Sequence, residues 1–180
     1  MTLRERFIRR VGLLSARSRS GSAMLEFALV APIFFILLLG ILETGVIYFA
    51  QATLLNATQD AGRLIRTGQA QDASMTQQQF RTQICNEISA ILPCNSNLQI
   101  DVESYSSFGS ASYGSPLTGS GTLNPALDNY ETGNPGDVVL VRVFYQWSVI
   151  TPLLTPFLVN LGSSTHLITA TTAFRNEPFN

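Results

Sequence analysis

The sequence predicts an α+β protein with a long N-terminal membrane helix, a second short helix and a small antiparallel sheet. Three observations support this class. Residues 27–42 carry no charge, apolar residues recur at helical spacing between residues 80 and 91, and three later stretches have the apolar content of strands. No helical pattern separates these strands, and strands joined without crossover helices favour an antiparallel sheet.

The first 21 residues form a basic leader. Six of the eleven arginines lie in residues 1–20, together with one acid, Glu5. Short arginine-rich flanks stay in the cytoplasm, which predicts a cytoplasmic N-terminus and an exported C-terminal domain. Residues 22–180 hold five arginines and eleven acids, so this part is acidic and offers no basic face for nucleic acid.

Residues 22–50 are the predicted transmembrane part of the first helix. The sixteen uncharged residues 27–42 span roughly 24 Å as a helix, and residues 22–25 or 44–50 complete the roughly 30 Å of bilayer hydrocarbon. A secretory signal is the alternative, because residues 50–52 read Ala-Gln-Ala. The apolar region is longer than the about 7–15 residues of a signal peptide and contains Glu43.

The same helix is predicted to continue to Thr67, with its outer half packed on the exported domain, residues 51–180. Apolar residues at three- and four-residue steps form the predicted packing stripe: Leu54, Ala57, Ala61, Leu64 and Gly68. Gly68 is also a natural helix stop.

A second helix is expected from Ser74, where residues 74–77 resemble a capping box, to Pro93. Its predicted apolar face consists of Phe80, Ile84, Ile88 and Ile91. Cys85 and Cys94 both fall in the exported part, and an oxidising compartment favours a disulfide between them. On the chain-entropy model, closing this ten-residue loop stabilises the folded state by a little less than ~3 kcal/mol.

Three strands follow. Residues 98–103 alternate apolar and polar, residues 138–150 are the strongest strand pattern, and residues 166–174 form a Thr-rich last strand. Residues 134–137, Asn-Pro-Gly-Asp, predict a type II turn before the second strand.

Residues 106–136 are predicted to be a flexible loop, because they are rich in serine, glycine and asparagine. The aromatic residues Phe108, Tyr113 and Tyr130 make the loop a candidate binding patch, and a variable exposed loop is the simpler interpretation. No arginine or lysine lies between Arg81 and Arg142, which argues against stacking on nucleic acid.

Nothing in the sequence predicts catalysis. The chain has one histidine, His166, no defensible nucleophile–base arrangement, no phosphate-binding loop and no metal-ligand spacing. We therefore expect no catalytic residues, metal, cofactor or small-molecule substrate.

One segment carries a family resemblance. After the basic leader come Gly21, Ser22, three further small or apolar residues, Glu26, Phe27 and the apolar run. This order resembles a class III signal, which a prepilin peptidase cuts after glycine. The text EFALVAPIFFILLLGILETGVIYFAQATLLNATQDAGRLIR is similar to the TadE family of minor pseudopilins from tight-adherence (Tad) pilus systems. The likeness is densest over residues 21–66, and the ending TATTAFRNEPF is also similar.

The resemblance implies a role for each of these positions. The scissile bond is Gly21–Ser22, and Glu26 and Phe27 become the fifth and sixth residues and the assembly contact. Glu26 would pair with the N-terminal amine of a neighbouring subunit, because opposite charges attract strongly at low dielectric. Glu43, near the outer membrane interface, is a candidate second assembly contact.

The resemblance also implies a structural subunit with a pilin-like domain in the bacterial inner membrane, its C-terminal domain periplasmic, and it allows incorporation into an extracellular pilus. The implied partners are a prepilin peptidase, other Tad pilins and pseudopilins, the inner-membrane assembly platform and membrane lipid. The alternative is an uncleaved single-pass membrane protein whose exported domain binds an envelope or surface partner through residues 106–136.

Overall fold

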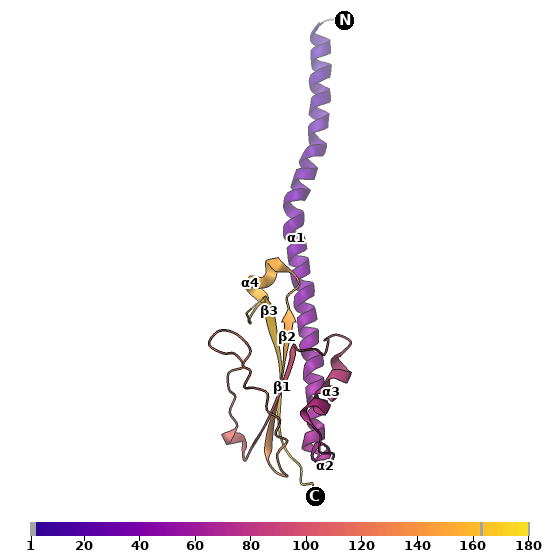
Figure 1. Ribbon diagram of the computed structural model, residues 1–180. Coiled ribbons are helices and arrows are strands. Elements are labelled where there is room, and N and C mark those ends of the chain that lie inside the picture. The colour runs from indigo at the N-terminus through magenta and orange to yellow at the C-terminus, as the bar shows by residue number, and fades with distance from the viewer. Residues whose placement is uncertain (1–2, 163, 180) are drawn as a thin grey trace. The chain divides into compact units, whose positions relative to one another are not determined.

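The computed structural model of the protein describes the backbone of residues 3–162 and 164–179 and the side chains of residues 21–162 and 164–179. The chain forms two compact units, the N-terminal unit Met1–Leu42 and the C-terminal unit Glu43–Asn180. The C-terminal unit combines helices with a three-stranded antiparallel sheet, so the predicted α+β class is confirmed (Figure 1).

Helix α1 runs from Leu3 to Arg66 and stays helical through Pro32. It begins before the predicted start at Ser22, because the leader contains no proline that would stop a helix. Within the C-terminal unit, one side of α1 is buried: Ile47, Ala50, Leu54, Ala57, Ala61 and Ile65. The predicted stripe is thus confirmed, except that Ile65 is fully buried in place of the half-buried Leu64.

The end of α1 is closed by the C-terminal residues of the chain. Gly68 has a φ of 81°, the left-handed conformation that ends helices, and an added Cβ there would lie 2.4 Å from the Phe179 ring. The backbone N–H of Glu177 donates to the carbonyl of Arg66 at 2.9 Å, and the two side chains form an exposed ion pair at 3.4 Å. The C-terminal residues of the chain therefore pack where α1 stops.

Two short helices follow, α2 (Gln69–Asp72) and α3 (Gln77–Ile88). The capping box lies two residues later than predicted: Thr76 is the N-cap, and its partner is Gln79. Ser74 instead has a φ of 47°, which excludes it from the helix start. Helix α3 ends at Ile88, before Pro93, and the predicted disulfide between Cys85 and Cys94 is present with a Cα–Cα distance of 5.7 Å.

The sheet contains β1 (Leu98–Tyr105), β2 (Val138–Ser148) and β3 (Thr165–Arg175) in the order β1-β2-β3. Both pairings are antiparallel, as predicted. The turn before β2 is confirmed, since the N–H of Asp137 donates to the carbonyl of Asn134 at 3.1 Å and Gly136 has a φ of 86°. Strand β2 stops two residues before the predicted end.

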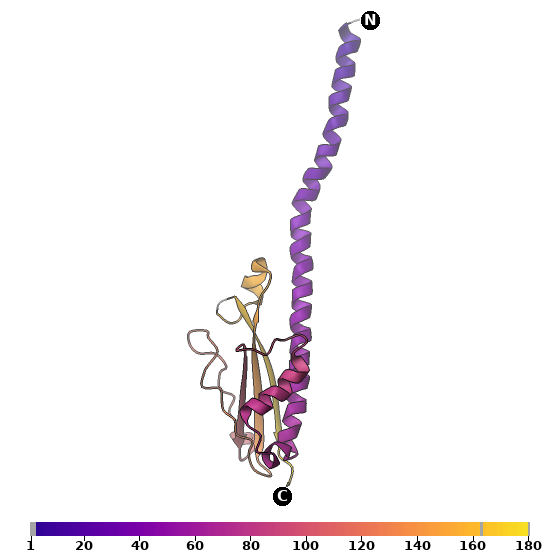
Figure 2. The same ribbon diagram turned by 45° about the vertical axis from the view of Figure 1, so that its right-hand side comes forward.

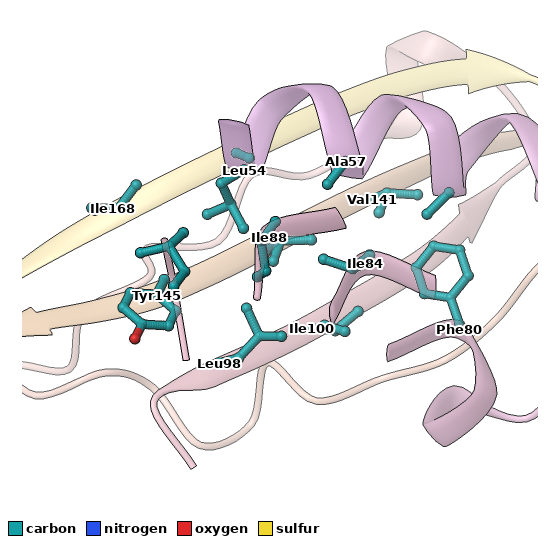
Figure 3. Packing of buried hydrophobic residues seen from close by; sticks show 14 of the residues in the cluster. Leu54, Ala57, Phe80, Ile84, Ile88, Leu98, Ile100, Val141, Tyr145 and Ile168 are labelled. Atoms are coloured by element: carbon teal, nitrogen blue, oxygen red, sulfur yellow. The ribbon is translucent and has the colours of Figure 1, made fainter. Parts of the chain in front are cut away.

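One face of the sheet carries the main core. Figure 3 shows Leu54 of α1, Ile84 and Ile88 of α3 and Val141 of β2 meeting in one cluster, and all four are fully buried. Burying a leucine or isoleucine side chain stabilises the folded state by about 1.5–3 kcal/mol. The helical and strand periodicities of the sequence are therefore satisfied on the same surface.

The other face of the sheet is covered by residues 106–136, which lie across the sheet from α1 (Figures 1 and 2). Leu127 of this loop is buried against Phe144 of β2. Tyr130 forms a parallel bridge to Val102 of β1. The loop is therefore attached to the sheet by an apolar contact and by a backbone bridge. It also contains the 3-10 turn η1 (Phe108–Ser110).

A buried ion pair lies beneath this loop. The Arg142 guanidinium donates to one carboxylate oxygen of Asp101 at 2.6 and 2.9 Å and to Glu103 at 3.2 Å. Its remaining nitrogen donates to the carbonyl of Gly114 at 3.2 Å, which joins the loop to the sheet. The second oxygen of Asp101 accepts from the backbone and side chain of Asn129. The loop thus screens a charge pair from water.

The environment of Tyr130 predicts that the folded protein becomes less stable at alkaline pH. Its ring packs on Phe80 at 5.6 Å, its buried hydroxyl has no hydrogen-bond partner among the described residues, and burial raises its pKa to about 12 from the usual 10.0. The unfolded chain then loses this proton first, so the free energy of unfolding falls as the pH rises between about 10 and 12. We expect Tyr130→Phe to lose less stability over this range.

The measurement is urea denaturation of the detergent-solubilised protein, followed by the fluorescence of its single tryptophan, Trp147. Near neutral pH, Tyr130→Phe is expected to match the wild type or exceed it slightly, because a buried unpaired hydroxyl is removed. Tyr113→Phe is the control, since Tyr113 is exposed. Identical alkaline profiles for the wild type and Tyr130→Phe would contradict the prediction.

Candidate processing and assembly site

The predicted cleavage residues lie in α1, within the N-terminal unit. Gly21 and Ser22 are both helical and exposed, and a Cβ added at Gly21 would meet nothing within 4 Å. Hydrolysis of a peptide bond inside a helix requires the helix to open locally. Glycine makes that opening easier by about 0.5–1 kcal/mol relative to alanine. The Gly21–Ser22 bond is therefore accessible, and the helix around it opens more easily than it would with alanine at position 21.

Glu26 is the only charged residue in positions 21–42. Its Oε1 accepts a hydrogen bond from the Ser22 hydroxyl at 3.2 Å, one helical turn earlier. Among the described side chains, no cation lies within ion-pair distance of this carboxylate. A hydroxyl does not neutralise the charge, so a carboxylate placed in lipid still requires a cation from elsewhere.

Most large apolar side chains around Glu26 are exposed in the described part of the chain. Phe27 is 70% exposed, and the exposed fractions of the other exposed large apolar residues in positions 21–42 range from 40% to 77%. By length and composition, Gly21–Arg66 is long and apolar enough to cross a membrane. This surface has to be covered by lipid or by other apolar helices, because its exposure to water would be unfavourable.

Glu43 occupies a different environment, in the C-terminal unit. It is buried, and its two carboxylate oxygens accept hydrogen bonds from the backbone N–H groups of Ile150 and Thr151 at 2.6 and 3.1 Å. From the sequence, Glu43 is predicted to lie near the outer membrane interface. No local pattern indicates its contact with Ile150, which is 107 positions away. A role in assembly stays a prediction for Glu43, and the intramolecular contact is its observed one.

Two features of the described residues concern metal binding and the lining of a cavity. None of their His, Cys, Asp and Glu side chains gather in threes in a way that could hold a metal ion. A cavity of about 250 Å³ opens between the sheet and the loop, and its lining consists of neutral residues, among them Gln99, Gln146 and Leu161. Such a lining contains no general acid or base.

The fold and this helix define a class: one N-terminal apolar helix joined to a small α+β unit, features that fit a membrane-anchored protein. Residues 21–63 match the family model of TadE-like protein, so the predicted resemblance is confirmed over that segment. The match suggests a protein associated with the Tad pilus. No curated protein and no solved structure matches the chain.

Proposed function

We propose that the protein is a structural subunit and not an enzyme: a TadE-like minor pseudopilin needed for assembly of a tight-adherence pilus. It is inserted in the bacterial inner membrane with its N-terminus in the cytoplasm and its C-terminal domain in the periplasm. A prepilin peptidase cuts it after Gly21. The observation that carries this proposal is the exposed apolar helix with one carboxylate, Glu26, in the segment that matches the family.

The proposed mechanism follows from the chemistry of that helix. Cleavage turns the Ser22 nitrogen into a positively charged amine, one turn from Glu26 in the same chain and available to Glu26 of a neighbour. The apolar helices pack side by side with other pilins and pseudopilins at the assembly platform. An ion pair between amine and carboxylate in this low-dielectric setting fixes the register, because an unpaired charge there is penalised.

Substitution of Gly21 tests the processing step. We expect Gly21→Ala to accumulate as the uncut precursor, since alanine stabilises the helix across the bond and adds a methyl group at the cleaved position. The helix effect alone slows opening up to about fivefold, from about 1 kcal/mol. Intact mass of the membrane fraction from cells that contain the peptidase measures the ratio of precursor to mature protein.

Gly45→Ala is the matched control, because Gly45 is also a helical glycine with nothing within 4 Å of an added Cβ. We expect normal processing of this variant. If Gly21→Ala were processed as fast as Gly45→Ala, cleavage at the Gly21–Ser22 bond would be excluded.

A second candidate function rests on the loop. Phe108 and Tyr113 are 57% and 66% exposed, which suits an uncleaved membrane protein that binds an envelope or surface partner through this loop. Deletion of the whole loop would expose the buried pair of Arg142 and Asp101, so a double substitution, Phe108→Ser with Tyr113→Ser, is the sharper test. Under the pseudopilin proposal this variant supports normal piliation, measured by electron microscopy of the cell surface. Lost piliation with normal membrane insertion and processing would favour the binding role.

A further inference from the structure

An apolar surface lies at the end of the sheet where β2 ends and β3 begins (Figure 1). It is formed by residues 150–158, which include the 3-10 turn η2 (Pro152–Leu154) and the short helix α4 (Thr155–Leu158). Ile150, Leu153 and Phe157 are 75%, 64% and 83% exposed. Leu153 and Phe157 lie in these two consecutive helical turns, and Ile150 lies two residues before them.

Exposed apolar residues of α1 lie at the same end of the unit, because Glu43 in α1 bonds to Ile150 and Thr151. Val46, Tyr48 and Phe49 lie in the first turns of α1 inside the C-terminal unit and are exposed. Elsewhere in the described part of this unit, the exposed large apolar residues are Phe108 and Tyr113 of the long loop. The apolar exposure of the unit is therefore concentrated at one end.

This end of the unit is also without exposed charge. No Asp, Glu, Lys or Arg occurs between Arg142 and Arg175 or between Glu43 and Asp60. The Glu43 carboxylate itself is buried and bonded to the backbone of the segment. Transfer of this surface out of water therefore removes no exposed ionic group from its hydration shell, which is the largest cost of entering lipid.

The backbone of the segment has few donors left for water. Glu43 accepts the N–H groups of Ile150 and Thr151, and the segment contains two prolines, which have no N–H. The N–H of Leu154 donates to the Thr151 carbonyl at 2.9 Å. The Leu158 carbonyl contacts Nδ1 of His166 at 2.5 Å. Satisfied backbone groups are the condition for placing non-helical chain at membrane depth.

Glu43 also fixes where this segment is attached. It directly follows Leu42, the last residue of the uncharged run in α1. The segment it binds is therefore tied to the helix at the point where the apolar run ends. We propose that residues 150–158 are a second membrane contact, which lies in the boundary between headgroups and acyl chains on the exported side.

This contact would restrict rotation of the C-terminal unit about α1 and hold it against the bilayer. The occupant is the acyl-chain region of the lipid rather than an anionic headgroup, because the segment offers no cation to a phosphate. This contact requires that the chain is anchored in a membrane, and it does not depend on cleavage after Gly21.

Tryptophan scanning in brominated lipid tests the proposal. The full-length chain is reconstituted in phosphatidylcholine vesicles with brominated acyl chains, as the parent and as the variants Phe157→Trp and Tyr113→Trp. Both substitutions replace an exposed aromatic residue with another aromatic. The constant signal of Trp147 is subtracted. Brominated chains quench a tryptophan in lipid, and acrylamide quenches one in water.

We expect the added signal of Phe157→Trp to be quenched strongly by brominated lipid and to be several-fold less sensitive to acrylamide than that of Tyr113→Trp. Equal acrylamide sensitivity of both variants, without lipid quenching, would place the segment in water and overturn the proposal. Protection from acrylamide without lipid quenching, increasing with the ratio of protein to lipid, would assign the surface to a second copy of the chain and overturn it equally.

Discussion

Glu26→Ala is expected to abolish piliation while the C-terminal unit remains folded and the precursor is still cut after Gly21. Glu26 is the one charge in residues 21–42, and the described side chains provide no cation for it. Loss of one partner of a desolvated ion pair costs about 3–5 kcal/mol. This corresponds to at least about a hundredfold weaker association between subunits.

Two control variants make this prediction specific. Glu26→Gln keeps the size of the side chain and its hydrogen bond to Ser22 while removing the charge, so we expect the same loss of pili. Glu87→Gln removes an exposed carboxylate from α3 and should leave piliation normal. Cells would be scored by pilus counts and by the amount of mature protein in the membrane. Normal piliation with Glu26→Gln would show that the charge is not the assembly contact.

Asp101→Ala is expected to lower the free energy of unfolding by about 3–5 kcal/mol, because it leaves the Arg142 guanidinium buried without its closest counter-charge. The two side chains are 0% and 5% exposed, and their shortest contact is 2.6 Å. The substitution also removes the acceptor for Asn129, which holds the loop. A loss of this size is a large part of the stability of a small domain.

Glu103→Ala is the comparison, since its side chain is 24% exposed and its contact with Arg142 is longer, at 3.2 Å. We expect a loss of about 1 kcal/mol or less, as for partly solvated ion pairs. Urea denaturation monitored by Trp147 fluorescence measures both variants. Equal losses for the two substitutions would mean that burial of the Asp101–Arg142 pair does not govern its energetic weight.

Much of the fold could be predicted because it depends on local periodicity. The alternation in residues 98–103 and the apolar run from Val138 identify two strands, and three- and four-residue steps identify the buried sides of α1 and α3. These patterns report which face of an element is buried, and the structure joins those faces in one core. Gly68 and the Asn134–Asp137 turn were predictable because their backbone geometry requires particular residues.

Other features depend on contacts between residues far apart in the sequence. Glu43 is an acid after an apolar run, and only the folded chain brings the N–H groups of Ile150 and Thr151 to it. Likewise, Arg142 interrupts an otherwise apolar strand, and its partner Asp101 is identified only by the register of β1 against β2. The predicted capping box lies two residues too early, because serine and threonine are both good N-caps and the local sequence does not distinguish Ser74 from Thr76.

The candidate site is recognisable from the order of residues in the sequence and does not depend on the folded geometry. A glycine, a carboxylate five residues later and a long apolar run are visible in the sequence, and the structure adds their exposure and the hydrogen bond between Ser22 and Glu26. Neither the periodicity nor the family match to residues 21–63 identifies the partner that covers this helix.

The most direct measurement is the N-terminal sequence of the membrane-bound protein, from cells with and without the prepilin peptidase. The pseudopilin proposal predicts a start at Ser22 that depends on the peptidase. A start at Met1 in both strains would contradict it and leave an uncleaved, signal-anchored membrane protein. A start at Gln51 or Thr53 would contradict it in another way, because the apolar helix would then be a removed signal and the remainder a secreted domain.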